Sequence, residues 1–193
     1  MVYVLYIELD DNIKNDKNIL NKYKNNIENH NQNVINNLYP DSGFDLFIPK
    51  LDNSIYKLEE NQTKLVPLCV KCCAYKFIKI NIKKIPSYSL VQTTFNKGIN
   101  SNVKPQPFFM YPRSSIWKQD LRLANSTGII DSGYRGTLYA PLHNVKYGEN
   151  IIRYGNRYLQ ICMPDLQPFL VQIVGEVKND SIRGTGGLGS TGN

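Results

Sequence analysis

The stretch NSTGIIDSGYRG, residues 125–136, contains a carboxylate in a setting that suits acid–base chemistry. Asp131 follows two apolar residues and precedes Ser-Gly, so we expect it at the end of a strand that enters a tight turn. Tyr134 and Arg135 come next, and a carboxylate on a rigid hairpin beside an aromatic ring could orient a water and take its proton. A turn aspartate that only caps backbone amides is the alternative, and this stretch alone does not separate the two interpretations.

A second stretch, YPRSS at residues 111–115, offers donors for a phosphate group. Arg113, Ser114 and Ser115 combine a guanidinium, two hydroxyls and backbone amides, and a phosphate oxygen could accept hydrogen bonds from all of them. Taken alone, the same stretch is also typical of an ordinary strand-to-turn connection with a surface ion pair.

The segment RGTGGLGSTGN, residues 183–193, contains the G-x-G-x-x-G spacing of a dinucleotide-binding turn. Such a turn lies between a strand and a helix that receives the pyrophosphate, and no helix follows it in this sequence. Its composition favours a disordered glycine-rich tail. Its arginine, hydroxyls and backbone amides could nevertheless close over phosphate.

The length and charge of the chain limit the classes to be considered. The 193 residues predict one domain with a real core, and the net charge of +7 is spread along the chain. This charge fits a polyanion, either a nucleic acid or a small phosphate compound. No run predicts a membrane span, and the opening MVYVLYIELDD reads as a strand because two aspartates interrupt it early. We expect a soluble protein of the cytoplasm or nucleus.

The apolar pattern predicts an all-β fold with one helical extension. Apolar residues recur at helical spacing over about residues 11–28, and a polar connector, NHNQNVINN, follows. From Tyr39 onward, short apolar stretches such as TKLVPLCV and YKFIKINI alternate with Gly, Pro, Asn and Asp, which indicates a β-sandwich or barrel. Residues 86–107 read as a polar, mobile insertion.

The cysteines raise a zinc hypothesis. CVKCC, residues 69–73, contains a C-x-x-C spacing, but no second pair exists and Cys162 stands alone. His30 and His143 lie far away in sequence. Small apolar residues on a strand, in a reducing compartment, are the interpretation that we prefer.

Five stretches in order resemble the five motifs of the homotrimeric dUTPase family: DSGFDLFIP (41–49), YPRSS (111–115), LANSTGIIDSGYRG (123–136), GNRYLQ (155–160) and RGTGGLGSTG (183–192). Each motif is weak evidence by itself, whereas the ordered set is specific. The N-terminal strand and helix and the long interval before YPRSS are similar to the apicomplexan members.

The resemblance implies a single domain over residues 1–193 with a dUTPase-like β-barrel or jelly roll. Residues 1–38 would be an N-terminal extension, and residues 183–193 a flexible C-terminal lid. Members form homotrimers whose three active sites are shared between chains, and they hydrolyse dUTP to dUMP and pyrophosphate with Mg2+. Neither a membrane nor a nucleic acid is required.

By match to the motifs, Asp131 would be the general base that directs water to the α-phosphorus. Tyr134 would lie under the deoxyribose and exclude a 2′-hydroxyl, and Asn125 with the backbone at Gly128 and Ile129 would read the uracil edge. The tight hairpin would also exclude a 5-methyl group, and hence dTTP.

The resemblance assigns the other motifs to the triphosphate. Asp45 would support magnesium through its water shell. The phosphate chain would be held by Arg113, Ser114, Ser115 and Gln160. The tail would close over the γ-phosphate and the base, through Arg183, Gly187, Leu188, Gly189, Ser190 and Thr191. Leu188 departs from the family pattern, which usually has an aromatic residue that stacks on the uracil.

Three alternatives remain open. A dCTP deaminase of the same fold would have a catalytic glutamate in place of Asp131 and would lack the glycine-rich fifth motif. A non-catalytic nucleotide-sensing homologue is a different class of protein, and loss of Asp131 or Arg183 would indicate it; both are present. A basic nucleic-acid-binding barrel would gather its Lys and aromatic residues on one face, whereas here they are dispersed.

Overall fold

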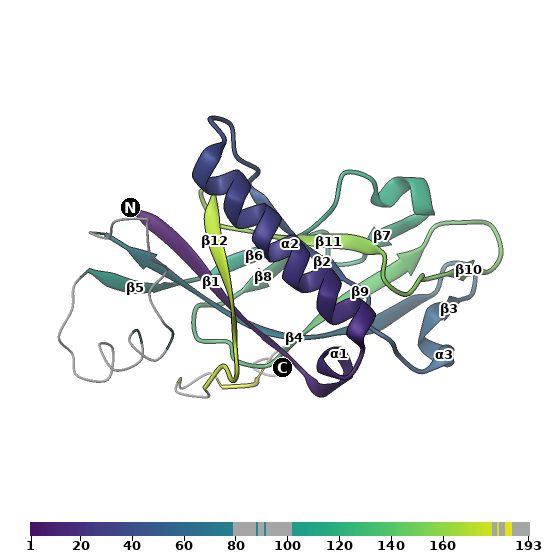
Figure 1. Cartoon of the computed structure of the whole chain (residues 1–193). Coiled ribbons are helices and arrows are strands. Elements are labelled where there is room, and N and C mark those ends of the chain that lie inside the picture. Colours follow the sequence, from purple (N-terminus) through teal and green to yellow (C-terminus); the bar gives the residue numbers. More distant parts are fainter. Residues whose placement is uncertain (79–87, 89–90, 92–101, 179–180, 182–183, 187–193) are drawn as a thin grey trace.

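The computed structural model describes residues 1–78, 88, 91, 102–178, 181 and 184–186. Within these residues the strands form two larger sheets and one two-stranded sheet (Figure 1). The six-stranded sheet contains β1 (Val2–Leu9), β4 (Thr63–Phe77), β5 (Val103–Gln106), β7 (Leu121–Leu123), β9 (Thr137–Asn144) and β12 (Phe169–Val174). The four-stranded sheet contains β2 (Gly43–Phe47), β6 (Phe108–Pro112), β8 (Gly128–Ile130) and β11 (Arg157–Cys162), and the small sheet pairs β3 (Lys57–Leu58) with β10 (Asn150–Ile151).

The order of the strands in the four-stranded sheet places four of the five motif stretches side by side. The large sheet runs β12-β1-β4-β9-β7 with β5 added to β4, and the four-stranded sheet runs β2-β11-β6-β8. Most neighbours are antiparallel, while β1 pairs with β12 in parallel. The predicted all-β class is confirmed, and two sheets around one core are consistent with a jelly roll.

One hydrophobic core fills the space between the sheets. Leu5 and Ile7 of β1 meet Phe44 of β2 and Ile161 of β11 in this core. Alternate residues of a strand point to opposite faces, and Tyr6 accordingly packs into a second, smaller cluster on the other side of β1. Strand β1 is therefore buried on both faces, which explains why its sequence is almost continuously apolar.

The helical extension differs from the predicted single helix over residues 11–28. A short helix, α1 (Asp11–Lys14), is followed by α2 (Lys17–Asn36), which includes the stretch predicted as a polar connector. The break has a local cause, since the Asp16 carboxylate accepts hydrogen bonds from the amides of Asn18 and Ile19 at 3.0 and 3.2 Å. Such N-caps begin a new helix.

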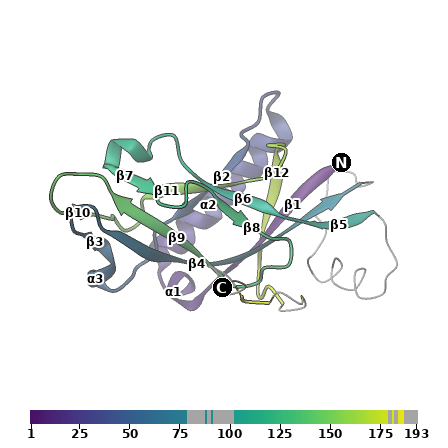
Figure 2. The ribbon, with the colours of Figure 1, turned by 180° about the vertical axis from the view of Figure 1, so that it is seen from behind.

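The second half of α2 is held by polar contacts to β12, which hydrophobic spacing does not show. The Asn31 side chain donates to the Val171 carbonyl at 2.9 Å and accepts from the Val171 amide at 2.8 Å. His30 is buried and donates from Nε2 to the Phe169 carbonyl at 2.9 Å. Figure 1 shows α2 crossing in front of β12 and β2, and Figure 2 shows the opposite side, with β6 and β8 in front of α2.

Two further expectations need correction in the six-stranded sheet. TKLVPLCV and the start of YKFIKINI form one strand, β4, with an irregular register between Pro67 and Lys71 and a left-handed Cys69 (φ 57°). Within the predicted insertion at 86–107, Val103–Gln106 form β5, because the end of β4 provides an edge with which they pair. The remainder of that stretch lies largely outside the described residues.

The four cysteines are all buried and unpaired by disulfides. Cys69, Cys72 and Cys73 lie on β4, as the interpretation of small apolar strand residues predicts. Burial raises the pKa of Cys69 to about 11, so its thiol stays protonated near neutral pH. Among the described residues, no helix combines the length and apolar character that crossing a membrane requires.

Candidate functional site

The structure places Asp131 at the end of a strand, as predicted. Strand β8 pairs with β6 and ends at Ile130, and the chain then turns so that the Tyr134 amide donates to the Asp131 carbonyl at 3.0 Å. A carboxylate at such a position projects from a rigid support, which general-base chemistry requires.

Asp131 opens onto a small cavity of about 210 Å³, here called the hairpin pocket. The pocket brings Asp131, the predicted base, together with four residues that the resemblance assigns to the nucleoside end of a substrate. Its lining comprises Met110, Asn125, Gly128, Ile129, Ile130, Asp131, Tyr134, Thr137, Leu138 and Tyr139. Amide, carboxylate and phenol groups on apolar walls are typical of a small-molecule site.

Close packing fixes the Tyr134 ring in this pocket. Its hydroxyl donates to the Thr137 carbonyl at 2.7 Å. A Cβ atom at Gly136 would lie 2.5 Å from the Tyr134 hydroxyl oxygen and 2.7 Å from Cζ, so the ring occupies the space that a side chain would need. Gly128 is less tightly constrained, since a Cβ there would lie 3.3 Å from the Met110 side chain.

Arg135 holds the turn, a role that none of the sequence motifs predicts. It is 5% exposed, and its Nη1 donates to the carbonyls of Ser132 and Tyr134 at 2.8 and 3.0 Å. Its backbone amide donates to the Gly184 carbonyl at 2.8 Å. The only signal in the sequence was the position of Arg135 between the tyrosine and a glycine.

Residues Ser181 and Gly184 contact the same turn. The Ser181 hydroxyl donates to the Gly133 carbonyl and accepts from the Gly184 amide at 3.1 Å. The beginning of the glycine-rich segment therefore lies beside the Asp131 turn of its own chain. The remaining predicted residues of that segment lie outside the described residues: Arg183, Gly187, Leu188, Gly189, Ser190 and Thr191.

Four other predicted residues, Asp45, Arg113, Ser114 and Gln160, line a second, wider hollow of about 860 Å³, here called the sheet pocket, whereas Ser115 faces a neighbouring pocket. Its floor is formed by neighbouring residues on three strands, because Gln160 of β11 pairs with Asp45 of β2 and Tyr111 of β6. Its lining comprises Asp41, Ser42, Gly43, Asp45, Tyr111, Pro112, Arg113, Ser114, Ser126, Gln160, Cys162 and Leu166. Gly43 leaves room for the Gln160 amide, which a Cβ at residue 43 would overlap.

Asp45 forms ion pairs with two arginines, Arg113 in the lining of this pocket and Arg157 beside it. Arg113 Nε lies 2.7 Å from Oδ1, and Arg157 Nη1 lies 2.9 Å from Oδ2. Burial raises the pKa of Asp45, and both guanidiniums act against that rise. The Asp45 carboxylate thus orients Arg113, while the group of one carboxylate and two guanidiniums keeps a net positive charge. Arg157 was not predicted, because its partner lies 112 residues away in sequence.

The acidic residues of the sheet pocket do not amount to a metal cage. Asp41 and Asp45 are the carboxylates in its lining, and the described part of the chain contains no group of three His, Cys, Asp or Glu residues arranged to hold an ion. Since both Asp45 oxygens contact arginines, these residues fit contact with magnesium through water and not direct coordination.

The two pockets lie on opposite faces of the four-stranded sheet. Met110 lines the hairpin pocket, whereas the next residue, Tyr111, lines the sheet pocket, and consecutive strand residues point to opposite faces. The pockets have no described lining residue in common. A single chain therefore keeps the Asp131 group apart from the Arg113 group.

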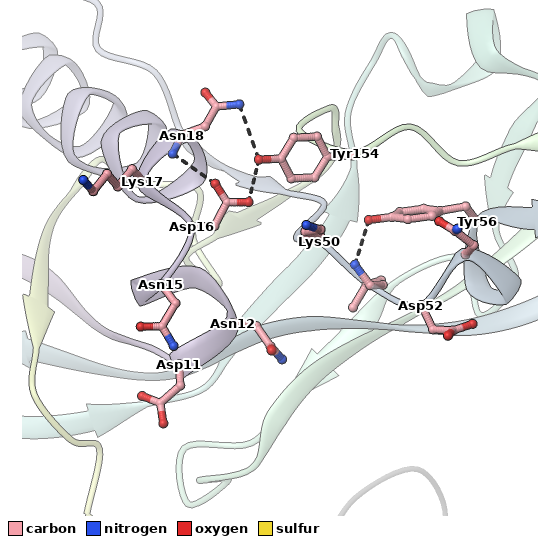
Figure 3. A pocket seen from close by; sticks show the side chains of 12 residues that line it. Asp11, Asn12, Asn15, Asp16, Lys17, Asn18, Lys50, Asp52, Tyr56 and Tyr154 are labelled. Atoms are coloured by element: carbon pink, nitrogen blue, oxygen red, sulfur yellow. Dashed lines mark hydrogen bonds between the residues drawn. The ribbon is translucent and has the colours of Figure 1, made fainter.

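A further hollow, of about 1040 Å³, lies between the N-terminal helices and residues 50–56 (Figure 3). Its polar groups form hydrogen bonds with one another. The Tyr154 hydroxyl donates to Asp16 Oδ2 at 2.6 Å and accepts from the side-chain amide of Asn18 at 3.4 Å. The bond from Tyr154 lowers the pKa of Asp16. The hydrogen bonds from Tyr154 to Asp16 and from Asn18 to Tyr154 hold the start of α2 in place. None of the predicted site residues lines this hollow.

The fold and the two pockets define an all-β protein with a carboxylate hairpin on one face of a sheet and a cationic hollow on the other. No protein-family model matches the chain. Curated deoxyuridine 5′-triphosphate nucleotidohydrolases match part of it. The protein of Escherichia phage T5 is 40% identical over 85 residues, which are 42% of this chain and 55% of the relative. That of Paramecium bursaria Chlorella virus 1 is 43% identical over 65 residues, 34% of this chain and 45% of the relative.

The predicted resemblance to the dUTPase family is thus confirmed over part of the chain. The chain spans about half the length of the curated relatives it matches. A solved dUTPase from Streptococcus mutans superposes with a TM-score of 0.40 at 21% identity, covering 72% of this chain and 88% of that one; a score this low adds nothing to the similarity of sequence. The apicomplexan affinity stays a prediction.

Proposed function

We propose that this protein hydrolyses dUTP to dUMP and pyrophosphate. The observation that carries the proposal is the hairpin pocket, where Asp131 lies beside Tyr134, Asn125 and the β8 backbone in a cavity of about 210 Å³. The sequence similarity to enzymes named for this reaction supports it.

In this proposal Asp131 orients a water and accepts its proton while the water oxygen attacks the α-phosphorus. A new oxygen–phosphorus bond forms, and the bond from the α-phosphorus to the bridging oxygen breaks, so pyrophosphate leaves. Tyr134 packs under the deoxyribose and leaves no room for a 2′-hydroxyl. Asn125 and the backbone at Gly128 and Ile129 bind the uracil edge. A positioned base of this kind contributes on the order of 10²–10⁴-fold to the rate.

The sheet pocket would bind the phosphate chain. Arg113, held by Asp45, supplies a charged donor, Gln160 and Ser114 supply neutral ones, and Ser115 adds a hydroxyl from the adjoining pocket. Mg2+ would arrive on the triphosphate, where it neutralises charge, and Asp45 would contact it through water. Positioning and charge neutralisation dominate reactions at such a polyanion.

The separation of the two pockets supports a shared site. Since one chain holds Asp131 and Arg113 on opposite faces of a sheet, we propose that a homotrimer joins the hairpin pocket of one chain to the sheet pocket of its neighbour. The glycine-rich segment, with Arg183, Ser190 and Thr191, would then cover the triphosphate. A segment that covers a site in this way excludes water during reaction and reopens for product release.

One assay separates the candidate functions: incubation with dUTP, dCTP, UTP and dTTP, followed for pyrophosphate and ammonia. We expect pyrophosphate from dUTP alone. Ammonia from dCTP would instead indicate a deaminase, and binding without turnover would indicate a nucleotide sensor. Fully active monomers in sedimentation experiments would contradict the shared site.

The role of Asp131 is tested with Asp131→Asn. We expect turnover to fall by about 10²–10⁴-fold while binding of a non-hydrolysable dUTP analogue is retained. Asp120→Asn is the matched control, because Asp120 is exposed and left-handed (φ 51°), a conformation that asparagine also accepts. Near-normal turnover of Asp131→Asn would remove Asp131 from the role of base.

A further inference from the structure

A third pocket, of about 440 Å³, adjoins the sheet pocket and is here called the basic pocket. Its charged lining residues are Lys22, Arg113 and Arg157, and the lining includes no carboxylate among the described residues. The complete lining comprises Lys22, Phe47, Arg113, Ser115, Gln119, Gly155, Asn156, Arg157 and Tyr158. Even with Asp45, which pairs with both arginines, three cations face one carboxylate, so two positive charges are left over.

Helix α2 is held against the strand that carries Asp45. The Tyr23 hydroxyl is buried and accepts from the Phe47 amide at 3.2 Å, and the Asn26 amide donates to the Asp45 carbonyl at 3.2 Å. Asn26 follows Lys22 by four residues, so the two lie on one face of the helix, and Tyr23 is the residue directly after Lys22. The backbone of Lys22 is therefore fixed relative to the sheet.

The lysine side chain is also directed into the basic pocket. Its Nζ lies 3.4 Å from the Gly155 carbonyl, a contact that leaves the ammonium able to donate to other acceptors. Gly155 is left-handed (φ 72°), and a Cβ atom there would lie 2.7 Å from Lys22 Nζ. A glycine at this position keeps the space that the ammonium occupies.

Arg113 and the two serines after it connect the basic pocket to the sheet pocket. Arg113 lines both pockets, while Ser114 faces the sheet pocket and Ser115 faces the basic pocket. A phosphate chain held by Arg113 in the sheet pocket therefore meets the basic pocket at its far end. Guanidinium, ammonium and hydroxyl groups without an opposing carboxylate in the lining are suited to a phosphate anion.

We propose that Lys22 is a substrate-binding residue, which α2 contributes to a subsite for the terminal phosphates of the triphosphate and for the pyrophosphate product. This inference rests on the proposed function, since it extends the phosphate site of the same reaction. It gives the N-terminal helix a part in the site in addition to its packing role.

The test is the binding of pyrophosphate and of dUMP, measured separately by titration calorimetry on the full chain. Lys22→Gln should weaken pyrophosphate binding by about 3- to 10-fold, as the loss of one half-exposed charged donor implies, and leave dUMP binding unchanged. Lys22→Arg should restore most of the pyrophosphate affinity. Lys24→Gln, an exposed lysine on the same helix, is the matched control and should change neither.

Equal pyrophosphate affinities for Lys22→Gln and Lys24→Gln would overturn the proposal. So would an equal loss of dUMP and pyrophosphate binding by Lys22→Gln, because that result would show a general disturbance of the fold. The binding measurement does not depend on turnover. If the protein proved not to hydrolyse dUTP, a selective effect of Lys22 on pyrophosphate would still establish the anion subsite.

Discussion

The contact between Gly136 and Tyr134 allows the hairpin pocket to be tested without touching a residue assigned to the chemistry. Gly136→Ala adds one methyl group at a point 2.5 Å from the Tyr134 hydroxyl oxygen and 2.7 Å from Cζ. Real Cβ atoms do not approach other atoms so closely. The ring must therefore move, and the bond from its hydroxyl to the Thr137 carbonyl must lengthen or break.

The expected magnitude follows from these two effects. Loss of the Tyr134 hydrogen bond costs about 1 kcal/mol, and inserting a methyl group into a packed site costs about 1–3 kcal/mol. We expect a total destabilisation of about 2–4 kcal/mol, which lowers the melting temperature of a chain of this size by about 4–16 °C. A displaced ring should also lower kcat/KM for dUTP by about 10- to 100-fold and weaken the discrimination against UTP.

Thermal unfolding and steady-state kinetics with dUTP and UTP measure these effects. Gly175→Ala is the matched control, since the same methyl group there meets nothing within 4 Å. It should leave the melting temperature and both rates near those of the wild type. The reasoning is refuted if Gly136→Ala behaves like Gly175→Ala, because the ring would then not be held where the structure places it.

Two further predictions concern the tail and the helix. Leu188→Phe should restore stacking on the uracil, worth about 1–3 kcal/mol where it is intact, and lower KM for dUTP; an unchanged KM and kcat/KM would show that Leu188 does not lie over the base. Burial lowers the pKa of His30 below its ordinary value of 6.5, so the unfolded chain takes up a proton there more readily than the folded chain. This contribution to stability is fully present above pH 6.5 and is lost as the pH falls from 6.5 through the lower folded pKa. Urea unfolding between about pH 7.5 and about pH 5.5 should therefore show a larger loss for the wild type than for His30→Gln, and equal losses would contradict this role of His30.

Local features of the sequence predicted the placement of Asp131 well. An apolar run, a carboxylate and then Ser-Gly define a strand end and a turn within a few residues, and the structure has β8 followed by that turn. The resemblance to the dUTPase family predicted that Asn125 and Tyr134 lie near Asp131. In the structure all three residues line the hairpin pocket.

Features that depend on distant partners were missed. The bond of Asp45 to Arg157 joins residues 112 positions apart, and no local pattern encodes such a pair. The end of α2 was placed too early because this part of the helix is polar, and its bonds to β12 from His30 and Asn31 show why the helix continues. The separation of the two pockets likewise depends on which face of β6 each residue occupies.

The parallel pairing of β1 with β12 bears on how this protein is made. Glu8 of β1 is nearly buried, pairs with Lys71 at 3.0 Å and accepts from the amide of Val177 at 2.7 Å, a residue 169 positions later. A ribosome therefore releases β1 long before β12 exists, and the backbone N–H and C=O groups along one edge of β1 stay unpaired with β12 until then. Such long-range closure makes folding slow. We expect nascent chains that stop before β12 to bind holdase chaperones strongly and to aggregate when these are depleted.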